Sequence, residues 1–512
     1  MSRKVLIIYP PNQLNPTEAP RPEGSLGPLY LASALENAGI ETDLVDASVG
    51  TEDDKLEDTF NNPVMQLNGL IRIGMSFDRI REFIALGGYD VVAIHSNFTP
   101  QTRMVLETAK IIKEINPEIL VISGGVNARH ILERLLGIGF VDLICITEGE
   151  RIIVKIVKQW RLNRSFDGVD GVVFMESGRL VYRPVNSDSV VQNLDELPVP
   201  AWHKLPLAKY AEITSPHGDV VLSEKYIYAP MMTSRGCPFK CAYCHISLEK
   251  EKHDDIGNLR LKSVDRVMRE IEILKSLGVT KVYIEDDSLL AKKARVKEIF
   301  TRLLGAGLKI ADVNGVNLVH LFVRDRATGK LRVDRDYLEL LCASGFDQIS
   351  FPVESGVQRV LDKYATGKLV LETMDIAGLV RVASDVGISC PVGIMMGFPD
   401  ETEAEILQSV ELAKKLVDAG AKYCSFYIPI PFPGSQLYHM AIAGGHLDAN
   451  FDPDIMNWHR PVMKNTTVPP ERVLELREWA WRSVNRDDYV AERLSKNIGT
   501  RWSSFKPVSD EN

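Results

Sequence analysis

Short runs of consecutive apolar residues recur along the first third of the chain, and most are followed by a stretch with helical periodicity. An unbroken apolar run is typical of a strand that is buried on both faces, as in a parallel sheet. Alternation of such strands with amphipathic helices predicts a doubly wound α/β domain. The expected strands are 4–9, 41–46, 89–95, 118–123 and 141–146, and the expected helices are 26–38, 101–115 and 149–160.

The residues that follow these strands are the candidates for ligand binding in this domain. A doubly wound sheet binds its ligands beyond the carboxyl ends of its strands. The strands end at Asp46, at His95 and at Gly124-Gly125, where glycine permits a close approach of the backbone. No Gly-x-Gly-x-x-Gly follows the first strand, so a dinucleotide site is not predicted.

The pattern changes between residues 163 and 225. Two stretches of alternating apolar residues, 170–175 and 179–183, flank a Ser-Gly turn and predict a β-hairpin. A proline-rich connection, 197–202, follows the hairpin. We expect this segment to be a linker between two domains.

A second alternation of strands and helices begins near Tyr226. Six strand–helix units predict a partial (β/α)6 barrel of the TIM type, in which active groups lie at the carboxyl ends of the strands. The expected strands are 227–234, 281–285, 312–318, 347–353, 390–396 and 422–428, and the expected helices are 262–277, 337–344, 379–386 and 403–419.

The tail after residue 440 is expected to be mainly helical, with one clear helix at 470–485. It is rich in aromatic residues that either contribute to a substrate pocket over the barrel mouth or only pack within a helical cap. The patterns therefore divide the chain into 1–162, 163–225, 226–440 and 441–512. The tail residues in question are Trp458, His459, Trp479, Trp481 and Trp502.

The length, the net charge and the apolar runs of the chain limit which classes of protein and partner are possible. A chain of 512 residues is too long for one core, and its net charge of −9 with no basic run argues against nucleic acid as a partner. No apolar run approaches the ~18 residues of a membrane span. The apolar run at the N-terminus is too short for a signal peptide, so we expect a cytoplasmic protein.

Three of the seven cysteines stand close together in the segment 233–245. Cys237, Cys241 and Cys244 have the spacing Cys-x3-Cys-x2-Cys, and thiolates select zinc or iron–sulfur clusters. A structural zinc site takes four protein ligands, and His245 could be the fourth only with strained geometry. A cubane cluster held by three thiolates leaves one iron open to a substrate or cofactor. The other four cysteines are expected to be core residues.

This segment resembles the signature of the radical S-adenosylmethionine superfamily. The resemblance implies that the three thiolates hold a 4Fe–4S cluster, whose open iron binds the amino and carboxylate groups of S-adenosylmethionine. Reductive cleavage then gives a 5′-deoxyadenosyl radical, which removes a hydrogen atom from the substrate. The electron would come from a donor such as flavodoxin or ferredoxin.

The same resemblance implies roles for residues at the barrel strand ends. Tyr243, Ile394 and Gly397 match the segments that surround the adenine, and Glu354 and Ser355 match the part near the methionine and ribose. Glu354-Ser355-Gly356 could instead cap a helix. Glu285, Asp286 and Asp287 lie where the family places polar groups that meet cofactor or substrate, with helix capping again the alternative.

The first third resembles the cobalamin-binding domain that precedes the radical module in one large subgroup. The pieces that match are 27–39 with Asp46, then Gly124 and Gly125, and then 141–142 with 148–150. The Asp-x-His-x-x-Gly motif of the other cobalamin enzymes is absent, so no lower-face ligand can be named. His95 and His130 are candidates only by residue type.

The resemblance, which spans about residues 1–440, predicts a cobalamin-dependent C-methyltransferase that acts on an unactivated carbon of a small molecule or natural-product intermediate. One S-adenosylmethionine would methylate the cobalamin, and a second would supply the radical. A cyclisation, oxidation or dehydration without methyl transfer, with a partly vestigial first domain, is the alternative. A methylthiotransferase needs three further cysteines in the N-terminal domain, where Cys145 is alone. A non-catalytic iron–sulfur or zinc module is the alternative from another class.

Overall fold

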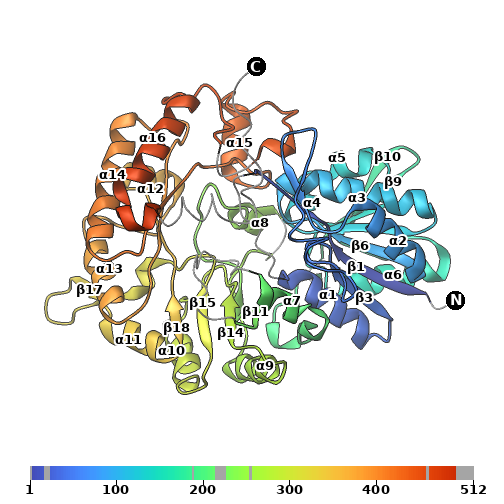
Figure 1. Cartoon of the computed structure of the whole chain (residues 1–512), viewed down its shortest axis with the longest axis horizontal. Coiled ribbons are helices and arrows are strands. Elements are labelled where there is room, and N and C mark those ends of the chain that lie inside the picture. The colour runs from blue at the N-terminus through green and yellow to red at the C-terminus, as the bar shows by residue number, and fades with distance from the viewer. Residues whose placement is uncertain are drawn as a thin grey trace. The chain divides into compact units, whose positions relative to one another are not determined.

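The structure is a computed structural model that describes residues 3–16, 24–186, 189–213, 226–252, 256–456 and 460–491 (Figure 1). It divides into two compact units. Unit 1 holds the described residues up to Ala229 together with Glu251, Lys252 and Ile256, and unit 2 holds those from Pro230 to Lys250 and from Gly257 onwards.

Unit 1 is built on a seven-stranded sheet with the order β10-β9-β8-β7-β6-β1-β3. The five strands from β8 to β3 in this order pair in parallel, which confirms the predicted doubly wound sheet. The bounds are β1 Lys4–Tyr9, β3 Thr42–Asp46, β6 Tyr89–His95, β7 Leu120–Gly124, β8 Leu143–Cys145, β9 Val172–Glu176 and β10 Arg179–Arg183.

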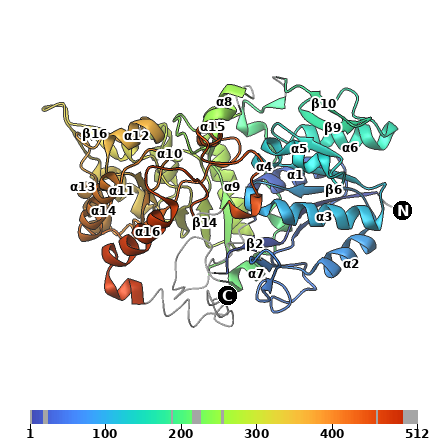
Figure 2. The same ribbon diagram turned by 90° about the horizontal axis from the view of Figure 1, so that it is seen from above.

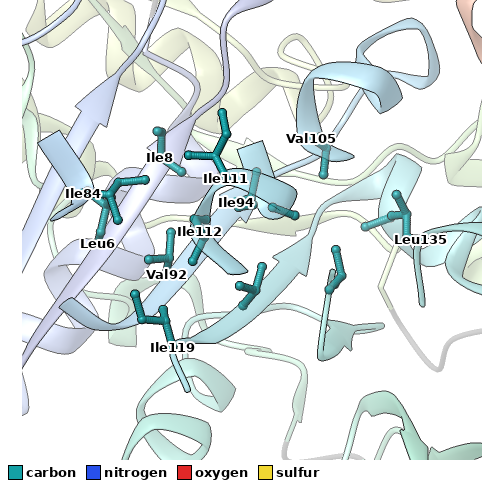
Figure 3. Packing of buried hydrophobic residues seen from close by; sticks show 14 of the residues in the cluster. Leu6, Ile8, Ile84, Val92, Ile94, Val105, Ile111, Ile112, Ile119 and Leu135 are labelled. Atoms are coloured by element: carbon teal, nitrogen blue, oxygen red, sulfur yellow. The ribbon is translucent and has the colours of Figure 1, made fainter. Parts of the chain in front are cut away.

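Helices cover both faces of this sheet because its strands are apolar on both sides. Alternate residues of a strand point to opposite faces, so Leu6 and Ile8 pack against α2 and α3 while Val5 and Ile7 pack against α1 and α6. Figure 2 shows α2 and α3 side by side, and Figure 3 shows the core on their face of the sheet. The bounds are α1 Leu26–Asn37, α2 Phe77–Gly87, α3 Thr102–Ile115, α4 Val126–His130, α5 Leu132–Gly137, α6 Ile152–Asn163 and α7 Leu207–Glu212.

The hairpin β9–β10 belongs to the sheet, and its assignment to a linker was wrong. β9 pairs with β8 in antiparallel fashion, with Phe174 opposite Leu143, so the hairpin continues the sheet beyond its last parallel strand. Such a pairing joins segments that no local pattern links. A small second sheet was not predicted because its strands are short: β2 Asn12–Leu14, β4 Val64–Met65 and β5 Ile71–Ile73.

Unit 2 contains the predicted barrel strands in chain order, in two sheets (Figure 1). The first sheet has the order β11-β14-β15-β18 and the second the order β19-β20-β21, and an isolated parallel bridge joins Gln348 to Ser389 between them. This arrangement is an open barrel. The bounds are β11 Tyr228–Met231, β14 Lys281–Ile284, β15 Lys309–Asp312, β18 Phe346–Gln348, β19 Phe351–Glu354, β20 Val392–Met395 and β21 Cys424–Tyr427.

Two strand predictions in this unit were wrong. The strand expected at 312–318 lies at Lys309–Asp312, and a 3-10 helix, η5, spans Leu318–Leu321. The single strand expected at 347–353 is two strands, β18 and β19, in different sheets. The helices are α8 Ile246–Lys252, α9 Val264–Ser276, α10 Lys293–Arg302, α11 Arg335–Ala343, α12 Gln358–Tyr364, α13 Ile376–Asp385, α14 Glu403–Asp418, α15 Gln436–Ala443 and α16 Pro470–Val484, and the remaining short strands are β12 Ser234–Arg235, β13 Arg260–Leu261, β16 Phe322–Arg324 and β17 Leu331–Val333.

A buried cluster of charges ties α9 to the segment that follows β11. The Glu270 carboxylate accepts from Lys262 Nζ at 2.5 Å and from Arg266 Nε at 2.7 Å. Lys262 Nζ also donates to the Met232 carbonyl oxygen at 2.8 Å. Burial lowers the pKa of Lys262 to about 8, although the Glu270 carboxylate opposes this shift.

Helix α16 lies along β21, the last strand of the barrel. The Asn485 side chain, which follows the helix, accepts from the Cys424 N–H at 2.7 Å and donates to the Cys424 carbonyl oxygen at 2.9 Å. Arg477 Nε donates to the Phe426 carbonyl oxygen at 2.9 Å. This helix therefore covers the edge of the barrel, as a helical cap would, and a contribution of the tail to a substrate pocket over the mouth stays a prediction.

The aromatic residues of the tail divide into two groups. Trp479 is 43% exposed, and Lys414 Nζ of α14 lies 5.6 Å from its ring centroid, so its ring is on the outer surface of unit 2. Trp481 is half-buried. Trp458, His459 and Trp502 lie outside the described residues. Within the described ranges, no helix combines the length and the apolar character that crossing a membrane requires.

Candidate active site

The cysteine segment forms a loop after β11, at the carboxyl end of the first barrel strand. Gly236 has φ 83°, and a Cβ there would lie 2.3 Å from the Asn258 carbonyl oxygen, so only glycine fits. The next residue, Cys237, donates its N–H to the Gly257 carbonyl oxygen at 3.1 Å. The start of the loop is therefore fixed against the chain at 257–258.

The second half of the loop is a turn that neighbouring elements hold from two sides. The Cys244 N–H donates to the Cys241 carbonyl oxygen at 3.1 Å, which brings the two cysteines onto one turn. Between them, Ala242 donates its N–H to the Tyr364 carbonyl oxygen at 2.8 Å and accepts from the Leu437 N–H at 2.7 Å. Helices α12 and α15 therefore fix the backbone of this turn.

All seven cysteines are free thiols, and burial governs the acidity of two in the loop. Burial raises the pKa of Cys241 and raises that of Cys244 to about 12. Bound iron deprotonates a thiol outright, so these sulfurs suit metal better than they suit acid–base chemistry. His245 Nδ1 lies 3.3 Å from Glu249 Oε2, one helical turn further on, so the imidazole is turned toward a carboxylate.

The three thiols are not arranged as the ligands of a single ion. No three His, Cys, Asp or Glu side chains among the described residues form a group that could hold one metal ion. The thiolates of a cubane cluster each bind a different iron, so they need not converge on one point as the ligands of a single ion do.

A buried trio of polar side chains lies beside the loop. Glu354 Oε1 accepts from Tyr243 Oη at 2.5 Å and from Lys368 Nζ at 2.9 Å, and Lys368 Nζ lies 3.2 Å from Tyr243 Oη. Burial opposes the charge on Lys368, but Glu354, Cys241 and Cys244 together hold its pKa above the usual value. Lys368 thus remains a cation close to the thiols of Cys241 and Cys244.

Glu354 has the conformation of a residue under backbone strain. It ends β19 with φ 68°, in the left-handed region that a non-glycine residue rarely adopts. Such strain persists only where the surroundings fix it, and it concentrates at functional sites. The hydrogen bonds from Tyr243 and Lys368 are the contacts that fix this carboxylate.

The two residues after Glu354 pack against α14. The Ser355 hydroxyl lies 3.1 Å from Ser409 Oγ and accepts from the Val357 N–H at 3.1 Å, and Ser355 is fully buried. Contact of Ser355 with a ribose stays a prediction. The alternative that 354–356 cap a helix is wrong, because the N-cap of α12 is Val357.

The loop after β20 is held by a buried carboxylate. Glu401 Oε2 accepts from the Gly397 N–H at 2.7 Å and from the Phe398 N–H at 3.1 Å, and burial raises the pKa of Glu401 to about 7. Gly397 has φ 95°, and a Cβ there would lie 2.8 Å from Val473. Ile394 is fully buried in β20, and its contact with an adenine stays a prediction.

The acidic residues after β14 face the cysteine loop. Asp286 and Asp287 accept hydrogen bonds from residues 233–236, and burial raises the pKa of both carboxyls. Glu285 is half-buried and donates its N–H to the Met231 carbonyl oxygen at 2.8 Å. The alternative of helix capping is wrong, because α10 begins at Lys293 with Lys292 as its N-cap.

In unit 1, the expected cofactor residues lie at the carboxyl edge of the sheet. Asp46 is buried; one oxygen accepts from the N–H and the hydroxyl of Ser48, and the other accepts from Tyr210 Oη at 2.6 Å. Gly125 has φ 115°, and a Cβ there would lie 2.5 Å from the Ser96 carbonyl oxygen. Asp46, Gly124 and Gly125 therefore shape the edge of the sheet, and direct contact with a cofactor stays a prediction.

The two candidate histidines of unit 1 are placed differently. His95 ends β6, its ring lies 5.3 Å from that of Tyr9, and burial lowers its pKa to about 4, so it is neutral near pH 7. His130 ends α4. A neutral imidazole can bind a metal ion, and His95 has the protonation state that this requires.

Three residues of these sites escaped the sequence analysis. Lys368 lies on the irregular segment after α12, and Tyr210 comes from α7 in the segment expected to be a linker. Asn317, whose Nδ2 lies 4.0 Å from Cys237 Sγ, lies before η5. No local motif marks them.

Two family models match the chain. A model described as the radical SAM superfamily matches residues 231–413, and one described as the B12 binding domain matches residues 18–157. The matches fall on unit 2 and unit 1, respectively. The radical SAM domain implies S-adenosylmethionine and a 4Fe–4S cluster, and the B12-binding domain implies cobalamin.

Two relatives that align with most of the chain are named as methyltransferases. The chain is 27% identical over 508 residues to an uncharacterized methyltransferase of Pyrococcus horikoshii, covering 98% of this chain and 92% of that one. It is 28% identical over 473 residues to cytidylyl-2-hydroxyethylphosphonate methyltransferase of Streptomyces wedmorensis, covering 87% and 83%.

A solved structure shares the fold. It is the radical S-adenosylmethionine methyltransferase TsrM of Kitasatospora setae with cobalamin and a [4Fe-4S] cluster, which matches with a TM-score of 0.62 and 17% identity over 88% of this chain and 80% of that one. The architecture of a B12-binding sheet followed by a radical SAM barrel is therefore shared.

Proposed function

We propose, from the premise that this chain belongs to the radical S-adenosylmethionine enzymes with a B12-binding domain, that it is a C-methyltransferase. The observation that carries the proposal is the match to methyltransferases along nearly the whole chain, through both domains. The S. wedmorensis relative is named for a small nucleotide-linked substrate, which supports a small-molecule substrate here. When bound, the cluster supplies the electron that generates the radical, and cobalamin supplies the methyl group.

The residues of unit 2 support the radical half of this function. Cys237, Cys241 and Cys244 would hold the cluster, and the open iron would take the methionine end of S-adenosylmethionine. That end carries an ammonium and a carboxylate. Glu354 offers the charge that an ammonium needs, and Lys368 offers the charge that a carboxylate needs, at a separation of 2.9 Å in the ligand-free pair.

The same pair would change partners on binding. With ligand present, Glu354 and Lys368 can each exchange part of their mutual ion pair for a ligand group of opposite charge. In the ligand-free structure, Tyr243 Oη lies within hydrogen-bond distance of both side chains and helps to position them. The pair is buried, so these bonds are stronger than they would be in water.

The residues of unit 1 support the cobalamin half by position. Asp46, His95 and Gly124 end β3, β6 and β7 at the carboxyl edge of the sheet, where a doubly wound sheet binds its ligands. His95 is the one neutral nitrogen ligand that this edge offers by residue type among the strand ends described. We keep it as a candidate for the lower face of cobalamin.

The test uses the whole chain, expressed with hydroxocobalamin and purified without oxygen. One cobalamin and one 4Fe–4S cluster for each chain are expected, with release of S-adenosylhomocysteine and of 5′-deoxyadenosine on reduction in the presence of S-adenosylmethionine. Release of 5′-deoxyadenosine alone, from protein without cobalamin, would instead favour the cyclase or oxidoreductase alternative. A Cys→Ala variant at any of the three cluster positions that still cleaves S-adenosylmethionine reductively would refute the radical assignment.

A further inference from the structure

Asp286, which lies just after β14, binds the segment that leads into Cys237. Asp286 is fully buried, and its two oxygens accept from the Thr233 N–H at 2.6 Å, the Thr233 hydroxyl at 2.7 Å and the Ser234 hydroxyl at 2.5 Å. Arg295 Nη2 donates to the Thr233 carbonyl oxygen at 2.8 Å. Thr233 is thereby bound through its N–H, its hydroxyl and its carbonyl group.

The carboxylate of Asp287, the next residue, binds the same segment closer to Cys237. Asp287 Oδ2 accepts from the Gly236 N–H at 2.8 Å, and the Cys237 N–H donates to the Gly257 carbonyl oxygen at 3.1 Å. Two consecutive acidic residues thus receive four donors from residues 233–236. Hydrogen bonds to ionised acceptors are the strong ones, so the position of Cys237 is well defined.

The side-chain amide of Asn317 lies close to the sulfur of Cys237. Asn317 Nδ2 lies 4.0 Å from Cys237 Sγ and donates to Ser288 Oγ at 2.9 Å. Asn317 is only 3% exposed, and Ser288 follows Asp287 directly, so the segment after β14 also anchors this amide. A buried amide held by one hydrogen bond is a fixed dipole toward the sulfur.

We propose that Asn317, together with the carboxylates of Asp286 and Asp287, is a positioning residue of Cys237 that sets the reduction potential of the cluster. The inference rests on the proposed function, because it needs the cluster at these cysteines. Reduction adds one electron to the cluster and changes no bond in the protein; the electron comes from an external low-potential donor. A hydrogen bond to a ligand sulfur stabilises the reduced state, which carries more negative charge.

The experiment measures the potential of the reconstituted full-length holoprotein by a redox titration followed by electron paramagnetic resonance. Asn317→Leu removes the donor at similar size, so its potential is expected to shift to a more negative value with iron and sulfide content unchanged. Ser288→Ala frees the amide from its anchor, and a smaller shift in the same direction is expected. Asn314→Leu is the matched control, since Asn314 is exposed and bonds the Glu285 carbonyl oxygen at 2.8 Å, and it should titrate as wild type.

Each result of the titration either supports or overturns the proposal. Wild-type potentials in both Asn317→Leu and Ser288→Ala, with full iron and sulfide, would overturn the inference. If Asn317→Leu takes up no cluster, the test rests on Ser288→Ala. A more negative reduction potential of that variant supports the inference, and a wild-type potential overturns it. A wild-type chain that takes up no 4Fe–4S cluster would refute the proposed function itself, which separates that failure from failure of this inference alone.

Discussion

Glu270 offers a sharp test of the buried charges behind the cysteine loop. Replacement by Gln keeps the shape of the side chain and removes the negative charge that Lys262 and Arg266 contact at 2.5 and 2.7 Å. The side chains of all three are at most 6% exposed, so water cannot replace the lost partner. Breaking a buried ion pair by removal of one partner costs about 3–5 kcal/mol.

The expected effect is large enough for calorimetry. For a unit of this size, each kcal/mol lowers the melting temperature by about 2–4 °C, so Glu270→Gln should lower that of unit 2 by roughly 6–20 °C. Differential scanning calorimetry of the apoprotein under anaerobic conditions can follow the transition of unit 2.

The same helix provides the control. Glu272 pairs with Lys275 at 3.2 Å, but their side chains are 66% and 37% exposed, so Glu272→Gln should cost at most about 1 kcal/mol. If the two variants melt within about 2 °C of each other, the reasoning from burial is refuted. A fall for Glu270→Gln alone would establish that these charges support the segment that precedes the loop.

Three further predictions concern unit 2. Because burial raises the folded-state pKa of Glu401 from 4.5 to about 7, wild-type stability should fall as pH rises through that window, and urea unfolding should show a shallower fall for Glu401→Gln. Gly397→Ala should cost about 1–3 kcal/mol through its φ of 95° and its clash with Val473, and its melting temperature should partly recover in a Val473→Ala background. Asn485→Leu leaves two backbone groups of Cys424 unsatisfied, about 1–3 kcal/mol each, and should speed hydrogen exchange of the Cys424 amide; unchanged exchange would contradict this.

The sequence analysis was most successful for features that are encoded in a short stretch of the chain. Strands such as β1 and β6 are unbroken apolar runs, so burial on both faces could be read directly. Cys237, Cys241 and Cys244 lie within eight residues, so their proximity could be read directly, and their role as cluster ligands stays a prediction. The strand β15 was misplaced because it is short and only its last three residues are buried.

The sequence alone could not predict contacts between residues that only the fold brings together. Lys368 meets Tyr243 from 125 positions away, and the donors of Asp286 lie more than 50 positions before it. The acidic run 285–287 has the composition of a catalytic cluster, yet two of its members bind backbone and hydroxyl groups of the loop. Nothing local distinguishes a carboxylate that meets a ligand from one that holds a loop.

The contact between α16 and β21 has a consequence for truncated chains. An open barrel ends in an edge strand, whose outward N–H and C=O groups can template pairing with a second chain. Here the Asn485 amide pairs with the outward groups of Cys424 as a neighbouring strand would, and Arg477 takes the carbonyl oxygen of Phe426. A chain cut before Pro470 would expose this edge, and its expected fate is aggregation through strand addition.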